Sequence, residues 1–185
     1  MASSMQLRAA CRALSLGGVI AYPTEAVWGL GCEPQNRHAC TKLLHLKQRD
    51  WRKGLILIAA DFEQLRPYVE PLSAAQLRPA LQTWPGPATW LLPASAHTPE
   101  WVRGEHASVA VRVTAHPLAA ALCRAYGGAI VSTSANRAGE SPAMKVAQIR
   151  LRFGMQVDAL LPGALGGLDK PTPIRDLHSG TLLRS

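Results

Sequence analysis

Hydroxyl, carboxylate and amide side chains follow two apolar stretches of this sequence that have the length of buried strands. Thr24 and Glu25 come after residues 19–22, and a Ser-Thr-Ser-Ala-Asn run at 132–136 comes after residues 129–131. Side chains at the end of a buried strand commonly project into a binding crevice, where hydroxyls suit phosphate or ribose. Either group could equally form an ordinary hydrogen-bonded turn, and the residues alone leave both interpretations open.

Positive charge gathers directly before a third apolar stretch, residues 54–60. Four cations fall within seven residues, namely Lys47, Arg49, Arg52 and Lys53. Such a cluster can neutralise a triphosphate, although cations on a protein surface are more often simply solvated.

Arg112 lies inside the alternating stretch 108–113, where it would share one face of a strand with Ser108 and Ala110. An arginine in that position needs an anionic partner, because buried charges are normally paired. The partner is either a bound ligand or a carboxylate of the protein, and the pattern does not choose between them.

Several familiar site signatures are absent from the sequence. The four cysteines form no Cys-x-x-Cys pair and the six histidines no His-Glu-x-x-His motif, so no metal bound by the protein is expected. Gly29-x-Gly31 lacks the third glycine of a dinucleotide fingerprint, and there is no Gly-Lys-Ser/Thr phosphate loop. The sequence also lacks the Gly-x-Ser-x-Gly motif of a serine nucleophile.

These residues must be positioned by the predicted helices and strands, which alternate along the chain. A first helix should begin after Ser3-Ser4 and end before Gly17-Gly18. Further helices are expected at 36–47, 74–81, 117–126 and 146–153, and strands at 19–22, 54–60, 88–92, 108–113 and 129–131. Residues 22–31 should form a turn that follows the first strand. This order predicts a mixed α/β fold.

The composition fits one globular domain with anionic ligands. The chain has 185 residues, of which 48% are hydrophobic and 17% charged. No apolar stretch could span a membrane and no signal peptide is recognisable, so we expect a cytoplasmic protein without a membrane partner. The formal net charge of +8 should attract the phosphates of either a nucleotide or RNA.

The sequence contains five motifs in one order: residues 22–31, Lys47-x-Arg49, residues 84–89, residues 109–112 and residues 132–136. Taken together, they resemble the YrdC/TsaC family of threonylcarbamoyl-AMP synthases, in its short bacterial form. The resemblance extends from Leu7 to Arg184. It implies a single domain over residues 1–185, with a twisted, mixed α/β sheet flanked by helices around a positively charged cavity (YrdC/RibB-like).

The resemblance also implies an activity. A family member is a nucleotidyltransferase that condenses L-threonine, bicarbonate and ATP to threonylcarbamoyl-AMP and pyrophosphate, for the threonylcarbamoyladenosine modification of tRNA. Mg²⁺ is expected to accompany ATP. The expected macromolecular partners are tRNA or double-stranded RNA and the tRNA threonylcarbamoyl transferase complex.

Site residues are carried over from the matching motifs. The catalytic residues would be Lys47 and Arg49, which meet the phosphates of the nucleotide. Threonine would be held by Thr24, Arg112, Ser132 and Thr172, with Arg112 taking the carboxylate. Nucleotide contacts are expected from Arg49, Lys53, Ser108, Ser134, Asn136, Pro142 and Arg184. Two residues depart from the family pattern. Asp50 stands where many relatives have Pro, and Ile58 stands where longer relatives have His.

Two other functions compete with this interpretation. An RNA-binding or ribosome-maturation module without catalysis would use the same positive charge, but the sequence has no RNP-like aromatic motif or Gly-x-x-Gly clamp. A carbamoyl-handling accessory domain is disfavoured, because the zinc-finger and acylphosphatase segments of such enzymes are absent.

Overall fold

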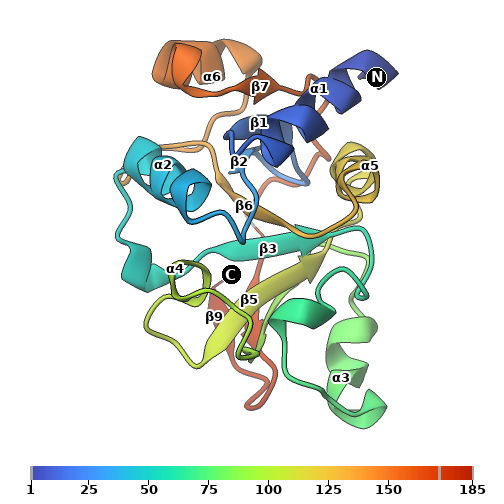
Figure 1. The fold of residues 1–185 in the computed structure, drawn as a ribbon. Helices are drawn as coiled ribbons and strands as arrows, with labels where there is room; N and C mark the ends of the chain where they lie inside the picture. The colour runs from blue at the N-terminus through green and yellow to red at the C-terminus, as the bar shows by residue number, and fades with distance from the viewer. Residues whose placement is uncertain (1, 171, 185) are drawn as a thin grey trace.

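The apolar stretches form the strands of one mixed sheet in the computed structural model, which describes residues 2–170 and 172–184. Within that part of the chain the strands are β1 Ile20–Pro23, β2 Trp28–Gly31, β3 Ile56–Ala59, β4 Thr89–Pro93, β5 Ser108–Val113, β6 Ile130–Ser134, β7 Ala159–Leu160, β8 Ile174–Asp176 and β9 Leu182–Arg184. Their order across the sheet is β7-β1-β2-β6-β3-β5-β4-β8-β9 (Figure 1). The pairs β1–β7, β3–β5 and β4–β8 are parallel, and the other neighbours are antiparallel.

Helices cover both faces of this sheet. They are α1 Ser4–Ser15, α2 Arg37–Lys47, α3 Ala74–Leu81, α4 Glu100–Arg103, α5 Pro117–Tyr126 and α6 Val146–Phe153, with 3-10 turns at Trp51–Lys53, Arg66–Tyr68 and Gly154–Gln156. Helices α1 and α5 lie side by side on one face, and α2 lies across the sheet from them (Figure 1). None of the helices in the described part of the chain is long and apolar enough to cross a membrane.

Two hydrophobic cores form because successive side chains of a strand point to opposite faces. Ile58 of β3 packs with Leu14 of α1 and Leu122 of α5, whereas its neighbour Leu57 belongs to the larger core on the other face, which includes Leu43 of α2. All five of these side chains are completely buried.

Two of the predicted site residues, Arg112 and Ser132, lie on the sheet face that α1 and α5 pack against, in a part that these helices do not cover. In the parallel register of β3 and β5, Ile58 stands opposite Arg112 and Ile56 opposite Ala110. Ile56 also stands opposite Ser132 of the antiparallel neighbour β6. Because paired residues point to the same face, Arg112 and Ser132 lie on the face of Ile58 and not in the larger core.

The predicted α/β fold, with a mixed sheet flanked by helices, is confirmed. The helices predicted at 74–81, 117–126 and 146–153 have these bounds in the structure, and Ser3 and Asn36 cap the first two helices. The prediction of one turn over 22–31 was wrong in extent, because the turn is confined to residues 24–27 and the chain continues as β2. The short elements α4, β7, β8 and β9 were not predicted.

Leu57→Ala should lower the free energy of unfolding by about 2–5 kcal/mol, because it leaves a cavity in the middle of the larger core. Leu57 is completely buried, whereas Leu151 on α6 is 88% exposed. The matched control Leu151→Ala should therefore change the free energy by less than about 0.5 kcal/mol. Urea unfolding followed by circular dichroism measures both, and equal midpoints for the two variants would contradict this assignment of the core.

Candidate functional site

A cavity of about 140 Å³ opens on the uncovered part of the α1/α5 face. It is lined by Thr24, Ala26, Val27, Gly29, Arg49, Leu55, Ile56, Arg112, Ser132, Thr133, Ser134, Pro142 and Thr172. The glycine in β2 keeps the cavity open, since a Cβ on Gly29 would come within 3.0 Å of Thr24 Cγ2. The residues predicted to hold threonine, which are Thr24, Arg112, Ser132 and Thr172, thus line one small chamber.

Arg112 is almost completely buried, and its guanidinium is held from two sides. Its Nη1 donates hydrogen bonds to Thr172 Oγ1 at 2.6 Å and to Thr89 Oγ1 at 3.2 Å. Its Nη2 lies 3.4 Å from Glu25 Oε2 in an ion pair whose side chains are 6% and 7% exposed. The anionic partner that the sequence requires is therefore a carboxylate of the protein, and the same arginine also faces the cavity.

The turn between β1 and β2 positions the two polar side chains of the Pro-Thr-Glu motif. Thr24 Oγ1 donates a hydrogen bond of 2.7 Å to the carbonyl of Val27, which also accepts from the Thr24 amide at 3.1 Å. Glu25 Oε1 accepts a hydrogen bond of 2.6 Å from Thr114 Oγ1. Thr24 therefore both closes the turn and lines the cavity.

Lys47, at the C-terminal end of α2, is buried behind the cavity and does not line it. Its Nζ donates to the carbonyl of Ser134 and, at 2.8 Å, to the carbonyl of Asn136. Burial, reinforced by the charge of Arg49, lowers the pKa of Lys47 to about 8. The lysine therefore ties the end of α2 to the loop that follows β6.

Arg49 is the residue that three neighbouring hollows share. It lines the small cavity, a second cavity of about 290 Å³ and a third of about 590 Å³. Its Nη2 donates to the carbonyl of Gly54 at 3.0 Å, and burial lowers its pKa from the ordinary value for arginine. The second cavity is also lined by Lys53, Arg103, His106 and Ser108.

The other predicted residues are placed as follows. Ser134 and Pro142 line the small cavity, whereas Lys53 and Ser108 line the second one. Asn136 lines neither, and its Nδ2 donates to the carbonyls of Arg137 and Glu140, each at 2.9 Å. The backbone of Arg184 belongs to β9, but its side chain lies outside the part of the chain that the structure describes.

The two departures from the family pattern have local structural roles. Asp50 caps the 3-10 turn Trp51–Lys53 by accepting a hydrogen bond of 3.0 Å from the Arg52 amide. Ile58 is completely buried in the core between the sheet and helices α1 and α5. Neither residue lines the small cavity.

Sequence reasoning assigned no role to Thr89, Thr114 or Glu25, although all three belong to the buried network of Arg112. One signal was available for Thr114, which comes two residues after Arg112 and so lies on the same side of the extended chain. Thr89 could not be found in this way, because it approaches from β4 and its proximity depends on the pairing of β4 with β5.

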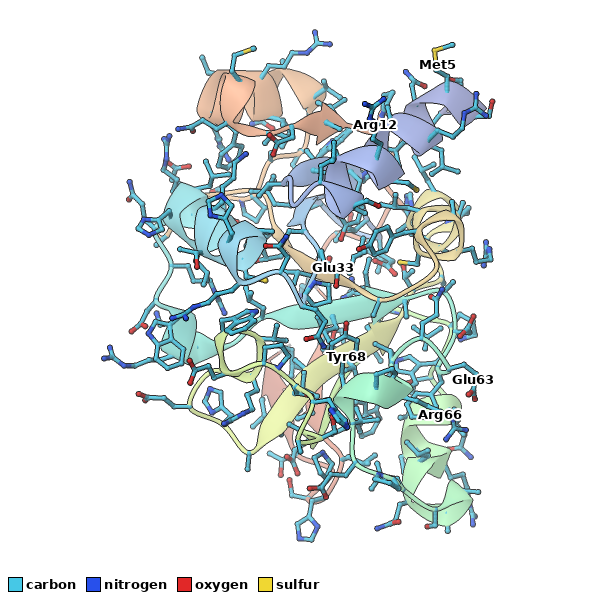
Figure 2. All side chains as sticks on the ribbon, viewed as in Figure 1. Met5, Arg12, Glu33, Glu63, Arg66 and Tyr68 are labelled. Carbon is cyan, nitrogen blue, oxygen red and sulfur yellow. The ribbon has the colours of Figure 1, made fainter. Side chains whose placement is uncertain are left out.

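A hollow of about 730 Å³ elsewhere on the surface has the opposite charge. Its lining includes Glu33, Asp61, Glu63 and Tyr68. Figure 2 shows Glu33 near the centre of the view, with Tyr68 below it and Glu63 further to the right. Burial raises the pKa of Glu33, and burial together with the charge of Glu33 raises the pKa of Tyr68 to about 12. This hollow would repel a polyphosphate, unlike the cavities around Arg49.

Among the described residues, no group of three or more His, Cys, Asp or Glu side chains could hold a metal ion. The free cysteines are Cys11, Cys32, Cys40 and Cys123, of which the last three are buried. The charged groups around the small cavity are cations and one paired carboxylate, a set that suits the binding of anions.

Comparison with known proteins identifies relatives of this chain. The Sua5/YciO/YrdC family model, described as telomere recombination, matches residues 12–185. A protein of Halorhodospira halophila named threonylcarbamoyl-AMP synthase is 58% identical over 97% of this chain and 94% of its own length. A protein of the same name from Nitrosococcus oceani is 54% identical over 97% of each chain.

Solved structures of two proteins share the fold. P. abyssi Sua5 complexed with L-threonine has a TM-score of 0.91 at 28% identity, and the match covers 98% of this chain and 54% of that one. This chain therefore spans about half the length of that Sua5. E. coli YciO has a TM-score of 0.87 at 26% identity, with 99% and 90% of the two chains covered. The chain belongs to the Sua5/YciO/YrdC family.

Proposed function

We propose that this protein is a threonylcarbamoyl-AMP synthase, which condenses L-threonine, bicarbonate and ATP to threonylcarbamoyl-AMP and pyrophosphate. One observation carries the proposal. A small chamber that presents a buried arginine and several hydroxyls shares the cation Arg49 with a larger chamber lined by further cations. The names of the relatives support the same activity.

The small chamber suits the amino acid. Its volume of about 140 Å³ is well below the roughly 300–1,000 Å³ of pockets for drug-sized ligands. Arg112 would grip the carboxylate, and the hydroxyls of Thr24 and Ser132 would contact the polar groups of threonine. P. abyssi Sua5, which shares the fold, is described in complex with L-threonine.

The larger chamber of about 290 Å³ suits the nucleotide. Lys53 and Ser108 line it, and Arg49 lies where the two chambers meet. A triphosphate there would place its reacting phosphorus beside the amino acid, with Arg49 able to neutralise charge on both. Ser134 and Pro142 line the small chamber, and we propose that they contact the nucleotide from that side. Asn136 and Arg184 are proposed nucleotide contacts as well.

The reaction has two bond-forming steps. The threonine amine attacks the carbon of bicarbonate and water leaves, which gives N-carboxy-threonine. An oxygen of the new carboxylate then attacks the α-phosphorus of ATP, and pyrophosphate departs with the electrons of the broken P–O bond. Positioning by Arg112 and charge neutralisation by Lys47, Arg49 and Lys53 would supply the catalysis. Mg²⁺ would accompany ATP and would neutralise part of its phosphate charge.

The product is a mixed anhydride that water hydrolyses readily, so we infer that it passes to a tRNA threonylcarbamoyl transferase complex in the cytoplasm. Binding of tRNA or double-stranded RNA to the basic surface is compatible with this activity. An RNA-binding module without catalysis is the competing function, and it would bind RNA in a salt-dependent way without consuming ATP.

Pyrophosphate release by the purified protein tests the activity directly. With ATP and Mg²⁺ present, release should require both L-threonine and bicarbonate, because neither alone completes the attacking carboxylate. Mixtures that omit each component are the controls. Release that ignores threonine, or no release from a folded protein that still binds RNA, would contradict the proposal.

The value of kcat/KM for ATP should decrease as the pH rises, with an apparent pKa of about 8. Lys47 is protonated below its lowered pKa and loses its charge above it, so neutralisation of the phosphates weakens as the pH rises. Lys47→Arg keeps its charge at higher pH and should shift the alkaline decrease of kcat/KM to a pH more than one unit higher. Lys47→Met should lower kcat by about 10²–10³. An unchanged alkaline limb in Lys47→Arg would show that another group titrates.

A further inference from the structure

Glu25 is a buried carboxylate that touches the key arginine of the small cavity but does not line the cavity itself. Its side chain is 7% exposed, and within the described part of the chain it is the only carboxylate that forms an ion pair with Arg112. Glu25 can therefore influence a ligand in this cavity through its ion pair with Arg112.

The direction of one hydrogen bond shows how Glu25 is fixed. Thr114 Oγ1 accepts from the amide of His116 at 3.2 Å and lies 2.6 Å from Glu25 Oε1. Because the hydroxyl already accepts from the amide, its single proton is free to point at the carboxylate. Glu25 Oε1 is thus occupied by Thr114, which leaves Oε2 to face Arg112 Nη2.

The backbone around Glu25 is held as tightly as its side chain. The amide of Leu168 donates to the carbonyl of Glu25, and the amide of Gly166 donates to the carbonyl of Thr24, both at 3.0 Å. Gly166 approaches so closely that a Cβ there would lie 2.8 Å from Glu25 Cα. Glu25 cannot follow Arg112 if the arginine moves, so the carboxylate acts as a fixed point.

We propose that Glu25, fixed by Thr114, is a positioning residue that aims the guanidinium of Arg112 at the carboxylate of the amino-acid substrate. Nη1 is directed by hydrogen bonds to the hydroxyls of Thr89 and Thr172, and Nη2 is drawn towards Glu25 by an ion pair at 3.4 Å that forms no hydrogen bond. A planar group with one end hydrogen-bonded and the other attracted by a carboxylate favours one orientation, so the substrate has less to order on binding. The role as stated rests on the proposed function, because it presumes that the ligand is threonine.

A purely charge-compensating role for Glu25 makes the opposite prediction. If the carboxylate only neutralised Arg112, its removal would leave a free cation that attracts the substrate carboxylate more strongly. If it positions Arg112, its removal lets the guanidinium rotate and binding weakens. The sign of the change in affinity therefore separates the two roles.

Calorimetric titration of Glu25→Gln with L-threonine and with L-threoninol tests the role. The amide keeps the size of the side chain and can still accept from Thr114, but it carries no charge to direct Arg112. We expect the Kd for L-threonine to rise at least tenfold. The Kd for L-threoninol, which has no carboxylate, should change less than twofold relative to wild type.

A matched pair at Thr114 covers the case in which Glu25→Gln does not fold. Thr114 does not line the small cavity, so its substitution leaves the lining unchanged. Thr114→Val should raise the KM for threonine several-fold with little change in kcat or in the KM for ATP, and Thr114→Ser, which retains the hydroxyl, should restore the wild-type KM. A loss shared equally by valine and serine would overturn the role, because it would show that only packing matters.

The outcomes distinguish this inference from the function on which it rests. Wild-type protein that binds no threonine and releases no pyrophosphate would overturn both. Wild-type protein that binds threonine, with tighter or unchanged binding in Glu25→Gln, would overturn the positioning role and leave the proposed function standing. Equal weakening for L-threonine and L-threoninol would also overturn it, because the effect would then not pass through the carboxylate.

Discussion

The guanidinium of Arg112 is buried in the middle of the sheet, and its charge has to be compensated there. Moving an ionised group out of water is costly, and the attraction within a buried ion pair often does no more than offset that cost. The pair with Glu25 therefore adds little to the free energy of folding, and its proposed role is to set the direction of the guanidinium. Much of the local structure serves this end: the turn after β1 carries Glu25, β4 supplies Thr89, and the segment after β7 supplies Thr172.

A second buried cation connects the two faces of the sheet. Lys47 belongs to α2, which packs on the larger core, yet its ammonium group ends on the carbonyls of Ser134 and Asn136 beside the cavity. Carbonyl dipoles compensate the charge less completely than a carboxylate would, while burial and the charge of Arg49 lower the pKa of Lys47. In the proposed reaction, a phosphate near the loop would supply the missing compensation for this buried charge.

The sequence predicts the long elements well because their signals are local. The apolar run at 54–60 contains the central strand β3, and a capping asparagine marks the start of α2. The alternation of Ser108, Ala110 and Arg112 also identifies the face on which the arginine lies. The glycines of β2 and the brevity of β7 to β9 give little local signal. Glu25 was visible as a carboxylate, but its partner depends on contacts between residues far apart in the chain, which motif matching alone does not supply.

In the proposed reaction, the position of Arg49 would let two substrates of different size react without a covalent intermediate. It is the residue shared by the small chamber and the two larger ones, and its own hydrogen bond to Gly54 occupies only one end of the guanidinium. A cation at the junction would lie close to the negative charge of both reactants. It would stabilise them most when the carboxylate and the phosphate approach and repel each other. Its stabilisation then grows toward the transition state, which is the condition for catalysis by a fixed charge.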